Sequence, residues 1–374
     1  MYNTIMRKIV LYVPSMTSGG AERVMVNLAN ELSKDNSLEI YLLTLFEGVN
    51  TKKVGKNVNV INSKGMGLLK MCRCLRDLRP DVLLSTSTSN IRAYLIHNFL
   101  PKQTLFVTRA PNIYYPWKSR SYNGLKYRLA SYLTWRAYQF SDALISNSPD
   151  TEKSLREAGI TNLIQTIGNP VFYRSEINDN AELPNDIKTP YILYVGSFKN
   201  QKRIDLLLEA YQKMSKLLDV NLVIVGDGAD NGNNKNKAVT FIEKNNLQNQ
   251  VFMVGRKSEL AGYYKHAKCF VLCSEYEGFG NVIVESLAYG TPVVCFDCPG
   301  GPSFILGKNE YGIRVNFGDT DSFAQRVCEI ISDKIVFNKE RLMERADSFS
   351  VESITNQYLM AIKYFYNKKF NTNF

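Results

Sequence analysis

Short apolar runs alternate with stretches of helical periodicity along the whole chain. In the first half, the apolar runs lie at 8–13, 38–45, 81–85, 104–108 and 142–146, and the amphipathic stretches at 21–33, 68–79, 121–140 and 150–158. In the second half, the runs lie at 191–195, 221–225, 250–254, 269–273 and 292–296, and the helical stretches at 203–218, 236–246, 257–266 and 280–289. This alternation is typical of βαβ units. It predicts an α/β fold with two doubly wound, Rossmann-like domains that face each other across a cleft.

The break between the two halves lies in a segment without apolar periodicity. Residues 168–190 read GNPVFYRSEINDNAELPNDIKTP and contain three prolines among several Asn and Asp. We therefore predict an N-terminal domain over 1–170, a linker over 171–190 and a C-terminal domain over 191–350. The stretch 339–368 has the pattern of one or two amphipathic helices, and residues 351–374 are expected to form a helix that packs back toward the N-terminal domain.

Composition excludes several classes of protein. The chain has 374 residues, of which 45% are hydrophobic and 22% charged, a balance typical of folded globular proteins and not of disordered or collagen-like chains. Its longest apolar runs fall far short of the roughly 20 residues that span a bilayer. The apolar run near the N-terminus is short and lacks a small-residue cleavage site, so we interpret it as a strand and not as a signal peptide. The seven cysteines are scattered, which favours reduced thiols in a cytosolic protein.

Positive charge is concentrated in the first half of the chain. Residues 1–170 carry 22 Lys and Arg against 11 Asp and Glu, whereas residues 171–374 carry 24 of each sign. The stretch 92–138 has no acidic residue and interleaves basic with aromatic side chains, including both Trp of the protein. Cations beside aromatic rings suit a lipid headgroup boundary, so we expect peripheral contact with an anionic membrane surface. A basic solvated face over an aromatic core, or nucleic-acid binding, are the alternatives; no nucleic-acid motif accompanies the stretch.

The segment with the most specific chemistry is SEYEGFGNVIVESLAYGTPVV at 274–294. It has the pattern of a strand end, a glycine-rich turn, a helix and a further strand. A helix that begins near Gly280 or Asn281 would point free N–H groups and a positive dipole end at an anion, as a diphosphate requires. Glu277 and Glu285 flank this turn. Each carboxylate on its own is equally well explained as a partner of the helix dipole.

Two glutamates with seven residues between them, including GFG, followed by AYGTPVV, resemble the signature of the family-4 retaining glycosyltransferases, which have the GT-B fold. Further segments stand in the order which that family shows, and the resemblance is strong in the second half and looser between 45 and 140. These segments are SGGAERV at 18–24, SNS at 146–148, GNPV at 168–171, VGSFKNQKRID at 195–205, VGDG at 225–228 and CPGGP at 298–302. Family members with a GGAERV start often assemble O-antigen, capsule or lipid-linked glycans in bacteria.

The resemblance implies roles for individual residues. Glu277 would accept hydrogen bonds from hydroxyls of the donor sugar, Glu285 would hold the ribose, and Lys202 would neutralise the departing diphosphate. Lys202, Glu277 and Arg109 are the expected catalytic residues. The expected nucleotide-sugar-binding residues are Gly19, Gly20, Ser197, Lys202, Arg203, Arg256, Glu277, Gly278, Phe279, Gly280, Asn281, Val282 and Glu285.

The chain departs from the family pattern at three positions. Ser197 stands where the family usually has an arginine, and Lys199 or Arg203 is a candidate substitute for the missing charge. Arg109 occupies the approximate place of a histidine that many relatives carry, and a role at an acceptor phosphate or at the donor would follow from its charge. Phe304 stands where relatives commonly have an acid. A histidine-based acid/base mechanism has little support, because neither His97 nor His266 lies at a matching position.

The expected function is transfer of a hexose or N-acetylhexosamine, from a donor that is UDP-linked in preference to GDP-linked, to a lipid-linked saccharide at the inner face of the cell membrane. The expected protein is cytoplasmic and peripherally membrane-associated, with no cofactor. The only DxD, at Asp319 to Asp321, has the pattern of a helix N-cap and not of a metal site. A hydrolase with Glu277 and Glu285 as acid and base, a non-catalytic nucleotide-sugar sensor and an epimerase on the same fold are the alternatives.

Overall fold

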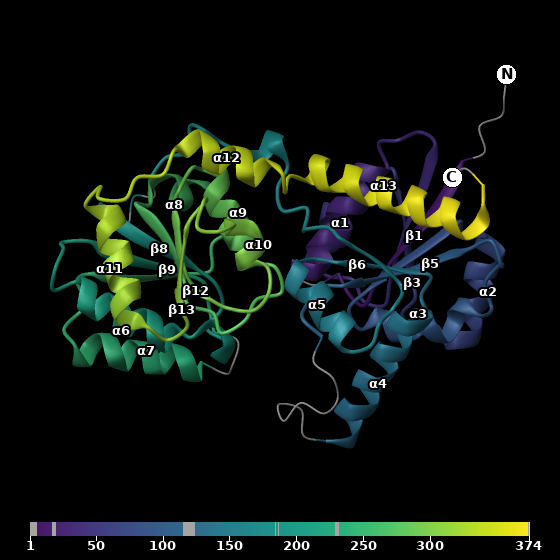
Figure 1. The fold of residues 1–374 in the computed structure, drawn as a ribbon, viewed down its shortest axis with the longest axis horizontal. Coiled ribbons are helices and arrows are strands. Elements are labelled where there is room, and N and C mark those ends of the chain that lie inside the picture. The colour runs from purple at the N-terminus through teal and green to yellow at the C-terminus, as the bar shows by residue number, and fades with distance from the viewer. Residues whose placement is uncertain are drawn as a thin grey trace. The chain divides into compact units, whose positions relative to one another are not determined.

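The computed structural model describes residues 6–16, 20–114, 124–183, 185, 187–228, 232–372 and 374. The chain forms two compact units (Figure 1). The first comprises Met1–Pro170 and Val351–Phe374, and the second comprises Val171–Ser350. Residues 171–190, which we expected as a linker, therefore belong to the second unit.

The N-terminal unit is built on a seven-stranded parallel sheet of order β3-β2-β1-β4-β5-β6-β7. The strands are β1 (Arg7–Val13), β2 (Leu38–Thr44), β3 (Val58–Asn62), β4 (Val82–Thr86), β5 (Leu105–Ala110), β6 (Ala143–Ser146) and β7 (Leu163–Thr166). The central strands are buried continuous apolar runs, as parallel strands covered on both faces require. The register pairs Ile9 with Ile40 on one side of β1 and with Val82 on the other.

Helices cover both faces of this sheet. They are α1 (Gly20–Leu32), α2 (Leu68–Leu78), α3 (Ser89–His97), α4 (Leu125–Phe140), α5 (Pro149–Glu157) and α13 (Val351–Phe370), with a 3-10 turn η1 (Val49–Lys53). Figure 1 shows α1 and α13 on one face and α3, α4 and α5 on the other. The C-terminal helix α13 contacts α1 and β5, so it belongs to the same unit as the first half of the chain.

The C-terminal unit has a six-stranded parallel sheet of order β10-β9-β8-β11-β12-β13. Its strands are β8 (Tyr191–Val195), β9 (Asn221–Val225), β10 (Val251–Gly255), β11 (Cys269–Leu272), β12 (Val293–Asp297) and β13 (Ile313–Asn316). Its helices are α6 (Ile204–Met214), α7 (Asn233–Lys244), α8 (Ala261–His266), α9 (Asn281–Ala288), α10 (Pro302–Leu306), α11 (Thr320–Ile331) and α12 (Lys339–Asp347), with 3-10 turns η2 (Arg174–Glu176) and η3 (Asn200–Lys202). The prediction of two doubly wound Rossmann-like folds is confirmed.

Candidate active site

The strand order of the C-terminal unit reverses between β8 and β11. The chain proceeds from β8 outward to β9 and β10, and then returns to place β11 on the other side of β8. Open α/β sheets bind ligands at such a switch point, beyond the carboxyl ends of the strands. The segment after β8 carries Lys202 and the segment after β11 carries Glu277, so the topology brings these two side chains together.

Lys202 and Glu277 form a largely buried ion pair. The Lys202 Nζ donates to Glu277 Oε1 over 2.6 Å, and the two side chains are 17% and 8% exposed. The Ser274 hydroxyl donates to the same Oε1, also over 2.6 Å. In the described part of the chain the other oxygen, Oε2, has no protein partner. One oxygen of this carboxylate is thus fixed by the protein, and the second is left for a ligand hydroxyl.

Hydrogen bonds to backbone carbonyls hold the two loops against each other. The Glu275 amide donates to the Gln201 carbonyl over 2.8 Å, and Gln201 Nε2 donates to the Tyr276 carbonyl over 2.5 Å. These bonds fix the segment around Lys202 relative to the segment around Glu277. The two side chains are therefore already close enough to form the ion pair.

The loop 298–302 forms the support beneath Glu277. The Glu277 amide donates to the Pro299 carbonyl over 3.0 Å. A Cβ atom at Gly300 would lie 1.9 Å from the Glu277 carbonyl oxygen, and one at Gly301 would lie 1.9 Å from that of Phe279. Only glycine therefore allows these two backbone segments to approach so closely.

Helix α9 begins directly after this support. Gly280 is its N-cap, with φ at +91°, a left-handed conformation that glycine adopts without strain. Asn281 and Val282 follow in the first turn, where helix amides lack intrahelical partners and the dipole favours anions. Phe279 is buried and packs edge-on against Phe304 and Phe349. Phe304, where relatives commonly have an acid, thus contributes to an aromatic cluster behind the turn.

Glu285 lies one turn further along α9. Its Oε2 accepts a hydrogen bond of 2.9 Å from the hydroxyl of Tyr264, a residue of α8 that is 1% exposed. Gly278 lies in the turn itself, and Arg256 is exposed immediately after β10. The C-terminal unit therefore carries both glutamates, Lys202, the start of α9 and Arg256 at the carboxyl edge of one sheet.

Ser197 and the two cations proposed to replace the missing arginine lie on the same loop. Ser197 is half-buried, and its carbonyl accepts a weak bond from the Tyr194 hydroxyl over 3.4 Å. Arg203 pairs with Asp205 over 2.7 Å and lies over the Phe317 ring. Lys199 and Arg203 both line a pocket of about 590 Å³ between α6 and α7. Arg203 therefore faces Asp205 and this pocket, and its role at a diphosphate stays a prediction.

Arg109 lies in the interior of the N-terminal unit. Its side chain is 0% exposed and donates to the Tyr358 hydroxyl over 2.9 Å, to Thr86 Oγ1 over 3.3 Å and to Asn169 Oδ1 over 2.5 Å. We expected Arg109 to face a substrate. Every residue of β5 is buried, so this strand places the Arg109 side chain in the core. The hydrogen bonds of Arg109 link β5 to α13 and to Asn169. Direct contact with a substrate stays an untested prediction.

Two further expectations concern the GGAERV segment and metal binding. Gly20 is the exposed first residue of α1, and Gly19 lies outside the described residues. The interpretation of Asp319 as an N-cap is confirmed, since its side chain accepts from the Ser322 amide over 2.9 Å, a bond that lowers the pKa of Asp319. Among the described residues no group of three His, Cys, Asp or Glu side chains is placed to hold a metal ion. Metal independence stays a prediction.

Sequence reasoning missed two contributors to the site, Tyr264 and Ser274. Ser274 stands three residues before Glu277, a spacing at which a hydroxyl at a strand end can reach back to the carboxylate. Tyr264 lies 21 residues from Glu285, and no local pattern indicates that contact.

No helix in the described ranges is both long and apolar enough to cross a membrane.

Two glycosyltransferase sequence profiles match this chain. The sequence profile described as "Glycosyl transferases group 1" matches residues 175–348, and that of "Glycosyltransferase Family 4" matches residues 18–172. The chain belongs to this family of two-domain, GT-B glycosyltransferases, and it is a hexosyltransferase.

Two of the relatives are named for steps of glycan assembly. The chain is 26% identical to the lipopolysaccharide core biosynthesis glycosyltransferase LpsE of Rhizobium meliloti, over 92% of this chain and 96% of the relative. It is 24% identical to the N-acetylgalactosamine-N,N'-diacetylbacillosaminyl-diphospho-undecaprenol 4-alpha-N-acetylgalactosaminyltransferase of Campylobacter jejuni, over 96% and 99%. The structure is similar to that of Anabaena HepE in complex with UDP and glucose, with a TM-score of 0.75, 17% identity and coverage of 95% and 99%.

Proposed function

We propose that this protein is a retaining glycosyltransferase that moves a hexose or N-acetylhexosamine from a UDP-sugar to a lipid-linked saccharide during assembly of a bacterial surface glycan. The observation that carries the proposal is the convergence of Lys202, Glu277 and the start of α9 at the switch point of the C-terminal sheet. A donor diphosphate needs a cation and amide donors, and a sugar needs a carboxylate with a free oxygen. This corner of the unit supplies each of them.

Each donor moiety has a partner of matching chemistry. Glu285 accepts from the ribose hydroxyls, Glu277 Oε2 accepts from hydroxyls of the sugar, and the first-turn amides of α9 receive the diphosphate. UDP is favoured because HepE, a structural neighbour, has been crystallised with UDP and glucose.

Lys202 acts on the leaving group. As the glycosidic C–O bond breaks, the diphosphate gains negative charge, and the ammonium group together with the dipole of α9 stabilises it. The acceptor hydroxyl attacks the same face of the sugar while its proton passes to the departing diphosphate oxygen. The anomeric configuration is thereby retained, and no enzyme nucleophile, cofactor or metal takes part.

The acceptor assignment is supported by the relatives. The Campylobacter enzyme is named for a diphospho-undecaprenol acceptor, and the Rhizobium enzyme for lipopolysaccharide core biosynthesis. We therefore assign a lipid-linked saccharide to this chain as well, and place the protein at the cytoplasmic face of the membrane.

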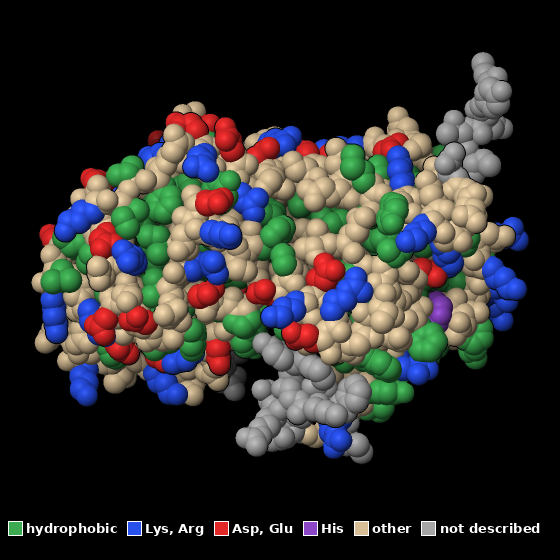
Figure 2. Space-filling model, viewed as in Figure 1, with side chains coloured by type: hydrophobic (Ala, Val, Ile, Leu, Met, Phe, Trp, Pro, Cys, Tyr) green, Lys and Arg blue, Asp and Glu red, His purple; other side chains and the backbone are tan. Residues whose placement is uncertain are grey.

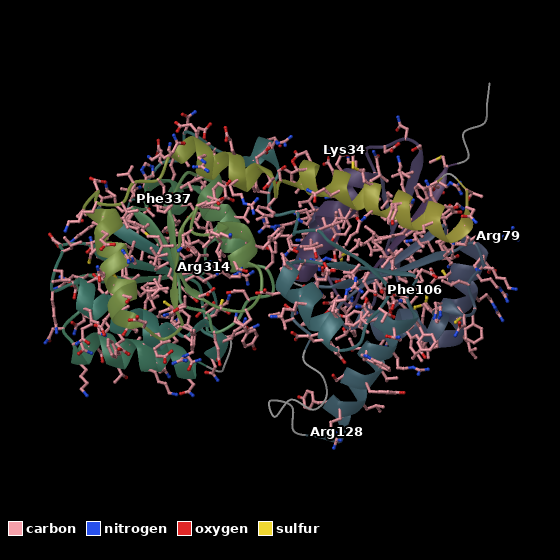
Figure 3. The ribbon with its side chains drawn as sticks, in the orientation of Figure 1. Lys34, Arg79, Phe106, Arg128, Arg314 and Phe337 are labelled. Carbon is pink, nitrogen blue, oxygen red and sulfur yellow. The ribbon has the colours of Figure 1, made fainter. Side chains whose placement is uncertain are left out.

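The surface proposed to contact the membrane is the outer part of α4, within the stretch 92–138. Tyr127, Leu129 and Tyr132 are 59%, 56% and 40% exposed, and Lys126 and Arg128 are exposed beside them. Figure 3 shows this end of α4 projecting from the N-terminal unit, with Arg128 near its tip, and Figure 2 shows hydrophobic and basic side chains together in the lower part of the same unit. Exposed apolar side chains among cations fit a layer of anionic headgroups over hydrocarbon.

Not all of the stretch is available for that contact. Tyr114 and Tyr138 are buried and packed edge to face, and Trp135 donates to the Ala158 carbonyl over 3.0 Å. The basic and aromatic residues at 115, 117, 118, 120 and 122 lie outside the described residues. The aromatic-core alternative thus holds for the inner side chains, and the membrane proposal concerns the outer ones.

Reversing two charges on α4 tests the membrane proposal. Lys126→Glu with Arg128→Glu should abolish co-sedimentation with vesicles of phosphatidylcholine and phosphatidylglycerol at low salt, and wild-type binding should itself fall steeply as salt rises. The matched control is Lys216→Glu with Lys244→Glu, which changes net charge equally at exposed positions of the C-terminal unit. Equal loss in both double variants, or no wild-type binding at low salt, would contradict the proposal.

Product analysis tests the transferase assignment. The protein incubated with radiolabelled UDP-sugars and a bacterial lipid extract should give a labelled, lipid-extractable product, at the same rate with and without EDTA. Glu285→Ala, which removes the ribose partner, should lower kcat/KM by about two orders of magnitude. Free labelled sugar as the only product would indicate a hydrolase, whereas UDP-sugar binding without any product would indicate a sensor.

A further inference from the structure

Each of the two site glutamates is held at one oxygen by a buried hydroxyl. Ser274 donates to Glu277 Oε1, and Tyr264 donates to Glu285 Oε2. We propose that Tyr264 and Ser274 are positioning residues that set donor affinity in two separable halves, Tyr264 for the ribose and Ser274 for the sugar. This inference rests on the proposed function, because it assumes which donor moiety each glutamate binds.

Tyr264 is built into the core so that its hydroxyl has a fixed place. The residue is 1% exposed, its ring stacks on Tyr289 at an interplanar angle of 5°, and it packs against Phe270. Its carbonyl accepts from Thr291 Oγ1 over 2.6 Å, which also anchors the backbone of α8. The Tyr264 ring is held by its neighbours and cannot move with the Glu285 carboxylate. The Tyr264 hydroxyl therefore sets the orientation of that carboxylate.

Ser274 performs the corresponding function for Glu277. It is 1% exposed and shares Oε1 with the Lys202 ammonium group, each over 2.6 Å. With two donors on one oxygen, the carboxylate cannot rotate without breaking both bonds, and Oε2 keeps its direction. Ser274 also leaves Glu277 with a donor when Lys202 turns to the diphosphate.

The two hydroxyls should therefore affect different ligands. Ribose is present in UDP as well as in every UDP-sugar, whereas the sugar hydroxyls are present only in the complete donor. Loss of the Tyr264 hydroxyl should weaken both ligands, and loss of the Ser274 hydroxyl should weaken only the complete donor. A merely structural role would instead lower the melting temperature and affect the two ligands alike.

The first arm of the test is Tyr264→Phe, which keeps the ring and removes the hydroxyl. UDP should bind about tenfold more weakly by calorimetric titration, and the KM of the UDP-sugar used in the product assay should rise by a similar factor with kcat little changed. The control is Tyr263→Phe, because Tyr263 is the adjacent residue, is 4% exposed and does not donate a hydrogen bond to Glu285. Wild-type UDP affinity in Tyr264→Phe would overturn the inference for the ribose half.

The second arm is Ser274→Ala. UDP affinity should stay within a factor of two of wild type, while the KM of the UDP-sugar rises about tenfold. The control is Ser286→Ala, since Ser286 is similarly buried and donates its hydroxyl to the Thr291 carbonyl and not to either glutamate. An unchanged KM, or a parallel loss of UDP affinity, would overturn the inference for the sugar half.

The wild-type protein separates failure of this inference from failure of the proposed function. If wild type neither binds UDP nor transfers sugar, the proposed function is wrong. If wild type does both and the two hydroxyl variants match their controls, only the positioning roles are wrong. A melting curve of each variant shows that the fold is intact before affinities are compared.

Discussion

Replacing Lys202 with alanine is expected to lower kcat by about two to three orders of magnitude, which is the usual effect of removing one preorganised group that stabilises transition-state charge. The substitution removes the ammonium group that pairs with Glu277 at the switch point, and with it the cation nearest to the proposed diphosphate position. UDP affinity should fall less than kcat, because charge on the diphosphate grows as the bond breaks. Steady-state turnover and UDP titration on the same preparation measure the two effects.

Lys216→Ala is the control for this prediction. Lys216 is an exposed lysine of the same unit and is not among the residues assigned to the donor, so its loss should leave kcat within a factor of two. Lys202→Ala also leaves the 8% exposed Glu277 carboxylate with Ser274 as its remaining partner, at a cost of about 1–3 kcal/mol in the free energy of unfolding. Lys202→Met with Glu277→Gln removes both charges and should recover stability without recovering turnover. Near-wild-type kcat in Lys202→Ala would remove Lys202 from the catalytic machinery.

The fold was predictable where strands are continuous apolar runs and unpredictable where they are not. The central strands β1, β4, β8 and β11 are buried and were found from the sequence. The strands β3, β7 and β13 were missed. Each lies at the edge of its sheet and is short and partly exposed, and in β3 both Asn59 and Val60 face solvent. These three edge strands lack the continuous apolar run of a strand covered on both faces, whereas the fourth edge strand, β10, has such a run and was found.

The site was predictable where one local segment carries it. Glu277, Gly280 and Glu285 stand within nine residues, so the strand–turn–helix geometry that brings them together can be read directly from the chain. Arg109 shows the opposite case. Two of the side chains that accept hydrogen bonds from its guanidinium group, Asn169 and Tyr358, are 60 and 249 residues away. Burial of a cation by distant polar side chains leaves no local pattern.

The glycine pair in the loop 298–302 was predictable only in part. The sequence indicates a turn there, but the need for two glycines comes from the backbone of the neighbouring segment, at Glu277 and Phe279. The Cβ that Ala would place at position 301 lies 1.9 Å from the Phe279 carbonyl oxygen and 2.7 Å from the Phe279 Cα, both backbone atoms that cannot move alone. Gly301 has φ at −77°, so a side chain there is excluded by space and not by backbone conformation.

Gly301→Ala is therefore expected to displace the segment 277–280 and lower kcat/KM by about 100-fold or more, because displacements of about 1 Å at a catalytic group have effects of this size. Overpacking should also reduce the free energy of unfolding by about 1–3 kcal/mol, seen as a lower melting temperature. Gly67→Ala is the control: Gly67 has φ at −67° and no atom within 4 Å of the added Cβ, so activity and melting temperature should stay near wild type. If Gly301→Ala kept both wild-type kcat/KM and wild-type stability, the close backbone contact beneath Glu277 could not be what positions the carboxylate.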